Sequence, residues 1–134
     1  MLGFKFKLTG HRKEFRQAKF SYKDSCIYEY DGVLTILIDN TKFFEDEIAI
    51  LEFFRDLIKW INSPRKSKNM LYNCIETEDN PLISFTCENG KWFICSPWQL
   101  FACKISFSRE ELENAILKLK NDVEMQLNIS IPES

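Results

Sequence analysis

Acidic side chains are the groups in this sequence best suited to chemistry, and they gather at two places. Glu76, Glu78 and Asp79 stand just before an Asn-Pro pair, and a second acidic group occupies 45–47. Neighbouring carboxyl groups can act as acid and base when their surroundings separate their pKa values. Each group also has a structural interpretation, because Asn-Pro is typical of a solvated turn and acids stabilise the first turn of a helix. A carboxylate-dependent enzyme built on Glu76, Glu78 or Asp79 is therefore one hypothesis.

The other reactive residue types give little support to catalysis. His11 is the one histidine in the sequence, so a Ser-His-Asp or Cys-His set would have to use it. The five cysteines form no Cys-x-x-Cys pair, which with a single histidine nearly excludes the usual structural zinc sets. None of the four glycines lies in a phosphate-binding motif. We expect no catalytic residues, no metal and no cofactor, and a protein that is not an enzyme.

Length and charge narrow the class of protein further. The 134 residues suit one α+β domain over 1–134. A net charge of −2 offers no basic footprint for nucleic acid, so we expect no nucleic-acid partner. No apolar run approaches the roughly 18 residues of a spanning helix, and the N-terminal segment lacks the apolar stretch of a signal peptide. We expect no membrane partner and a cytoplasmic location.

The elements that must position these residues begin with a strand and a hairpin. Apolar residues alternate with lysine over 4–8, which is the period of a half-buried strand. Asp31-Gly32 lies between the apolar runs 26–30 and 33–38, and this arrangement predicts a two-residue hairpin turn.

A helix is predicted to follow directly. Residues 39–41 are candidate N-caps, and apolar residues recur at helical spacing from Phe44 through Asn62. Glu52 falls on the opposite, solvent-facing side of this helix. Ser63-Pro64 is expected to end it.

The second half of the sequence is predicted to form further strands. Residues 70–75 are expected to form one strand. Asn89-Gly90 between apolar runs is the strongest hairpin signal in the chain, since a type I′ turn needs positive φ at both residues. Its register pairs Cys87 with Trp92 and Phe85 with Ile94. A strand is also predicted over 98–107, with every second residue from Phe101 facing the core.

Ser108 and Glu111 form a capping box before the last helix, in which each residue satisfies a backbone donor of the other. The apolar stripe of this helix consists of Leu112, Ala115, Ile116, Leu119, Val123 and Leu127. The predicted fold class is α+β: an antiparallel sheet of about six to eight strands built from hairpins, with two amphipathic helices packed on it.

Part of the sequence resembles a known group of proteins. The segments 78–85 and 92–99, followed by a capped helix, resemble small bacterial immunity proteins of contact-dependent inhibition and other polymorphic toxin systems, over roughly the last sixty residues. The resemblance implies a non-enzymatic protein in the bacterial cytoplasm that binds a cognate toxin, often a nuclease, and neutralises it. Immunity proteins are diverse, so no binding residue is transferred by position.

An interface hypothesis follows from the chemistry of such a partner. A nuclease site is basic because it holds phosphate, and an acidic patch opposite it speeds encounter and fixes register. Glu76, Glu78 and Asp79 form the densest acidic turn. Trp98 and Gln99 follow a Ser-Pro strand break and are expected near this turn, and exposed tryptophans are enriched as interface anchors. The structural alternative for Trp98 is a residue at the rim of the core.

Two other functions remain open, together with the oligomeric state. One is a small-molecule or peptide-binding α+β module with the sheet as the floor of its pocket, and the other is the carboxylate-dependent enzyme. An apolar cavity of about 300 Å³ or more with convergent polar groups favours the module. A recessed carboxyl group with a strongly raised pKa favours the enzyme. Both a monomer and a homodimer are compatible with the sequence.

Overall fold

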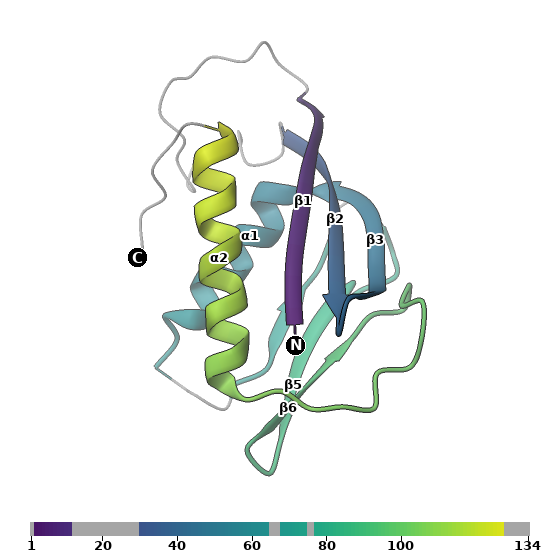
Figure 1. Ribbon diagram of the computed structural model, residues 1–134, viewed down its shortest axis with the longest axis vertical. Helices are drawn as coiled ribbons and strands as arrows, with labels where there is room; N and C mark the ends of the chain where they lie inside the picture. The colour runs from purple at the N-terminus through teal and green to yellow at the C-terminus, as the bar shows by residue number, and fades with distance from the viewer. Residues whose placement is uncertain (1, 12–29, 65–67, 75–76, 128–134) are drawn as a thin grey trace.

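The computed structural model describes residues 2–11, 30–64, 68–74 and 77–127. In chain order the elements are β1 (Leu2–His11), β2 (Tyr30–Ile38), β3 (Thr41–Ala49), α1 (Ile50–Ile61), β4 (Met70–Tyr72), β5 (Ile83–Glu88), β6 (Lys91–Cys95) and α2 (Arg109–Leu127) (Figure 1). The α+β class is confirmed. The single sheet is wrong, because the strands of the described residues form two three-stranded antiparallel sheets, β1-β2-β3 and β4-β5-β6.

The alternation in β1 produces a sheet with one buried face. Phe4 and Phe6 are buried while Lys5 and Lys7 are exposed, as the sequence predicts. Phe4 pairs with Ile36 of β2, so both point into the core from the same face.

The predicted turn at Asp31-Gly32 is wrong. Both residues lie inside β2, and the turn falls at Asp39 and Asn40, where φ is 51° and 66°. Gly32 is needed for a different reason: a Cβ there would lie 3.0 Å from the Lys7 carbonyl oxygen of β1. The glycine thus permits close approach of two strands. The other predicted strand of this hairpin falls mainly in 26–29, outside the described residues.

The predicted start of the first helix is also wrong. Residues 41–49 form β3, and α1 begins at Ile50. A spacing of four residues, as between Phe44 and Ile48, suits a helix face and equally a strand face, where it is two periods of two. The turn at Asp39 and Asn40 decides between them, because it returns the chain alongside β2 as a third strand.

Helix α1 is the central element of the core. It contacts β2 and β3 of the first sheet, β4 of the second, and α2. The Phe53 ring packs edge-on against Phe4 and Tyr72, with centroid distances of 6.3 and 5.1 Å. The helix ends before Ser63-Pro64, as predicted. Figure 1 shows α2 running alongside β1, with α1 behind it.

The second sheet contains the hairpin that the sequence predicts best. Asn89 and Gly90 have φ of 52° and 77°. Cys87 pairs with Trp92 and Phe85 with Ile94, so the predicted register is confirmed.

The predicted strand over 98–107 is wrong. Within it only Phe107 makes a ladder contact, an isolated bridge to Trp92. The chain turns after β6, and the Leu100 amide then donates to the Phe43 carbonyl at 2.7 Å. As a result Leu100 and Ile105 are 62% and 43% exposed, although the sequence places Ile105 in the core.

Helix α2 starts as the sequence predicts. The Ser108 hydroxyl accepts a hydrogen bond from the Glu111 amide at 3.1 Å. The predicted apolar stripe is buried at Leu112, Ala115, Ile116, Leu119 and Val123.

Candidate functional site

The acidic turn at 77–81 is fixed by one side chain, Asn80. Its Oδ1 accepts from the Cys74 amide at 2.8 Å, and its Nδ2 donates to the carbonyls of Cys74 and Thr77 at 3.1 and 2.7 Å. The Thr77 hydroxyl in turn accepts from the Asp79 amide at 3.1 Å. Glu78 and Asp79 are exposed at the tip of this turn. The side-chain bonds of Asn80 and Thr77 fix the backbone that carries them.

A second turn, 96–99, faces the first. The Ser96 hydroxyl accepts from the Trp98 amide at 3.0 Å, and the Gln99 Oε1 accepts from the Ser96 amide at 3.1 Å. Local bonds of this kind compete with strand pairing, which explains why the chain leaves the sheet here. The Gln99 side chain therefore stabilises its own turn.

One hydrogen bond joins the two turns. The half-buried Trp98 donates from its indole Nε1 to Asp79 Oδ2 at 2.9 Å. The structure thus brings together Asp79 and Trp98, as the interface hypothesis expects, with Glu78 beside them on the acidic turn. Glu76 lies outside the described residues.

A cleft of about 570 Å³ lies between the turns, lined by residues 78–81, Ser84 and 95–97. We call this the acidic cleft. The described residues that line it include two carboxylates, Glu78 and Asp79, and no basic side chain. Its floor is formed by adjacent strands, since Ser84 of β5 pairs with Cys95 of β6.

Ser84 is the residue of this cleft that sequence reasoning missed. The register of the Asn89-Gly90 hairpin already places Ser84 opposite Cys95. The sequence does not show that the 77–81 turn folds back over this pair, because the path of that turn depends on the Asn80 hydrogen bonds.

The second acidic group lies on the exposed part of strand β3 instead of at a helix start, with Glu45 and Glu47 on the outer face of the first sheet. Glu45 accepts hydrogen bonds from the Thr35 hydroxyl at 2.8 Å and from Lys42 Nζ at 3.2 Å. These bonds, Thr35 foremost, lower the pKa of the exposed Glu45 carboxyl. A lowered pKa makes this group a poor proton donor near neutral pH.

Glu52 is not solvent-facing, contrary to the sequence prediction. It is 2% exposed and accepts a hydrogen bond from the Tyr72 hydroxyl at 2.8 Å. Burial is the main cause that raises the pKa of Tyr72, and contacts with Cys74 and Glu52 raise it further. The pair lies within the core and joins α1 to β4.

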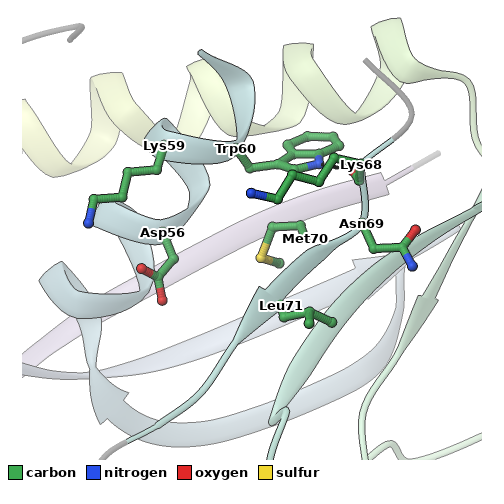
Figure 2. A pocket seen from close by; sticks show the side chains of 7 residues that line it. All are labelled: Asp56, Lys59, Trp60, Lys68, Asn69, Met70 and Leu71. Carbon is green, nitrogen blue, oxygen red and sulfur yellow. Dashed lines mark hydrogen bonds between the residues drawn. The ribbon is translucent and has the colours of Figure 1, made fainter. Parts of the chain in front are cut away.

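A smaller hollow of about 160 Å³ lies between α1 and the start of β4, and Trp60 is one of the residues that line it (Figure 2). The Trp60 indole donates to the Lys68 carbonyl at 2.6 Å, and Asn69 Oδ1 accepts from the Cys87 amide at 3.0 Å. In Figure 2 the Asn69 amide points away from Asp56 and Lys59. The hydrogen bonds of Trp60 and Asn69 hold the segment before β4 in place, and the polar groups that line the hollow do not converge on a common point.

In the part of the chain that the structure describes, no cluster of three or more His, Cys, Asp or Glu side chains is arranged to hold a metal ion. No helix among the described residues is long and apolar enough to cross a membrane.

Comparison with known proteins places the chain in a family without assigning it an activity. Neither the curated proteins nor the solved structures contain a match to it. One family model, described as a domain of unknown function (DUF7878), matches residues 4–129, and the chain therefore belongs to the DUF7878 family.

Proposed function

We propose that this protein is a non-catalytic binding module that docks a basic surface of a partner protein onto the acidic cleft. The observation that carries this proposal is the hydrogen bond between Trp98 Nε1 and Asp79 Oδ2, 2.9 Å long. It joins an aromatic side chain to an exposed carboxylate, and the two supply apolar contact area and charge at one place. Aromatic anchors beside complementary charge are typical of protein interfaces.

Rigidity of the surface supports binding. The three Asn80 side-chain bonds and the Ser96 and Gln99 bonds hold both turns from within. A surface ordered before it meets its partner loses less conformational entropy on association. Leu100, which is 62% exposed, extends the surface with apolar area next to the second turn.

The partner that best fits this surface is a toxin domain with a basic active site, such as a nuclease. Two observations support this choice of partner. Residues 78–85 and 92–99 resemble bacterial immunity proteins, and the acidic cleft contains carboxylates. The module would then act in the bacterial cytoplasm and neutralise the toxin by covering its site.

Co-expression with the product of the neighbouring gene tests the proposal. The wild-type protein is expected to co-purify with that product and inhibit its activity. Replacing Glu78 and Asp79 together by lysine is expected to weaken both effects. Glu88→Lys, at an exposed position at the end of β5, is the control for a change of charge outside the acidic cleft and should leave both unchanged. No inhibition by the wild type, or equal inhibition by the double variant, would contradict the proposal.

A small-molecule module is the second candidate, and an apolar groove favours it. This groove, of about 340 Å³, is lined mainly by Ile38 and by residues 101–105. If it holds an apolar ligand, such ligands should raise the melting temperature of the wild type. Ile105→Lys at the rim should abolish that rise, whereas substitutions in the acidic cleft should not.

A further inference from the structure

The side chain that points to a specific ligand in the acidic cleft is Ser84. It is 8% exposed, lies on the central strand of the second sheet and lines the cleft. No hydrogen bond connects its hydroxyl to any other residue that the structure describes. The hydroxyl therefore keeps its donor and its acceptor capacity for a ligand that enters the cleft.

The other polar atoms of the cleft define what that ligand must offer. The carboxylates of Glu78 and Asp79 accept hydrogen bonds and carry negative charge. Asp79 uses Oδ2 for the Trp98 indole, which leaves Oδ1 for another donor. The Ser96 hydroxyl already accepts from the Trp98 amide. The cleft therefore suits a cation that donates several hydrogen bonds in different directions.

A guanidinium group meets this requirement better than an ammonium. It is planar and weakly hydrated, and it presents five N–H donors in a fixed fork. Pro81 and Pro97 line the cleft with apolar surface against which a planar group can stack. Lysine offers a compact, strongly hydrated charge that exploits such surface less well.

The lining also indicates that the guanidinium comes from a protein. Free arginine would bring its own carboxylate next to Glu78 and Asp79, and the described lining has no basic side chain to balance it. An arginine within a polypeptide has no such charge. We propose that the acidic cleft accepts one arginine side chain of the partner protein, whose guanidinium pairs with Asp79 and Ser84. This inference rests on the proposed function, since it names the residue by which the partner is anchored.

The experiment uses Nα-acetyl-L-arginine amide as a probe, titrated into the ¹⁵N-labelled full chain and followed by NMR. Comparison with Trp98→Phe identifies the Trp98 indole N–H signal. The probe is expected to shift this signal and the Ser84 amide signal saturably. The corresponding lysine amide should bind more weakly, and the uncharged isostere Nα-acetylcitrulline amide should give no saturable shift.

Variants locate the contact. Asp79→Asn keeps an oxygen for the Trp98 indole and removes the charge, so the Kd for the arginine probe should rise by about tenfold or more. Ser84→Ala should also raise this Kd. Glu88→Gln removes a distant exposed carboxylate and should leave it unchanged. The NMR spectrum shows for each variant whether the fold is retained.

Several results would overturn the inference: no saturable shift with the arginine probe, equal binding of the citrulline probe, or equal affinity of Ser84→Ala and the wild type. Tighter binding of free arginine than of the blocked probe would overturn the assignment to a protein side chain. If the arginine probe does not bind but substitution of Glu78 and Asp79 still weakens inhibition of the partner, the inference is wrong and the proposed function stands. Probe binding without any effect of these residues on the partner would remove the proposed function instead.

Discussion

Tyr72 on β4 donates a hydrogen bond to Glu52 on α1 at 2.8 Å, and neither side chain is more than 2% exposed. The bond fixes the second sheet to the helix that also packs under the first. A carboxylate buried at this position depends on such donors, because an unpaired buried acceptor carries its full desolvation cost.

Tyr72→Phe removes this donor and keeps the ring in place. We expect it to lower the free energy of unfolding by about 1–3 kcal/mol, measured by urea denaturation. Glu52→Gln retains an oxygen acceptor for Tyr72 and should cost less than Glu52→Ala. A Tyr72→Phe variant as stable as the wild type would show that the bond contributes nothing net.

The same pair predicts a loss of stability at alkaline pH. Burial raises the pKa of Tyr72 above its ordinary value of 10.0, so the folded state keeps the proton while the unfolded state releases it. The contribution is complete below pH 10 and declines above it, by about 1.4 kcal/mol per pH unit for one group. The stability difference between wild type and Tyr72→Phe should therefore shrink as pH rises above 10. A constant difference between pH 9 and 11 would contradict the raised pKa.

Two glycines of the first sheet provide a matched test of its register. A Cβ at Gly32 would lie 3.0 Å from the Lys7 carbonyl oxygen, whereas a Cβ at Gly3 meets nothing within 4 Å. Gly32→Ala should destabilise the protein by about 1–3 kcal/mol, because the obstacle is backbone that is paired in the sheet. Gly3→Ala should be neutral or stabilising by up to about 1 kcal/mol. Thermal or urea unfolding decides, and equal effects of the two changes would argue against β1 pairing with β2 at this position.

The same glycine shows what the sequence could predict and what it could not. The Asn89-Gly90 turn is local, since two residues with positive φ determine it, and its register was predicted in full. Gly32 was assigned to a turn because the sequence does not show that β1 passes close to it. The distinction between a glycine that turns and one that lets strands approach is a tertiary property.

The candidate site divides in a similar way. The acidic turn was predicted from residue types, and the interface hypothesis placed Trp98 and Gln99 near it. The bond between Trp98 and Asp79 and the burial of Ser84 depend on how the chain folds after Cys95, where a strand was expected. Apolar alternation favoured that strand, but the side-chain bonds of Ser96 and Gln99 form a turn at the point where the strand would begin.

Asn80 is predicted to control the order of the acidic cleft. Asn80→Ala removes three hydrogen bonds of the turn and should lower stability by about 1–3 kcal/mol. It should also speed hydrogen exchange at the Trp98 indole N–H, because Asp79 is no longer held against it. Asn73→Ala, at an exposed neighbouring position, is the control and should change neither quantity. Unchanged exchange at Trp98 in a folded Asn80→Ala variant would show that the turn is ordered by other means.

Association with the partner should depend on charge more than on contact area. Carboxylates that face a basic surface accelerate encounter, and salt screens this effect. Replacing Glu78 by Gln and Asp79 by Asn together should slow association at low ionic strength by about tenfold. The same double variant should flatten the dependence of the association rate on salt, measured by stopped-flow mixing of the purified partner with each variant. Glu88→Gln removes one carboxylate at a distance from the cleft, half the loss of charge of the double variant, and should retain most of the wild-type salt dependence. If it behaved like a cleft variant, the acceleration would come from the net charge of the protein and not from the acidic cleft.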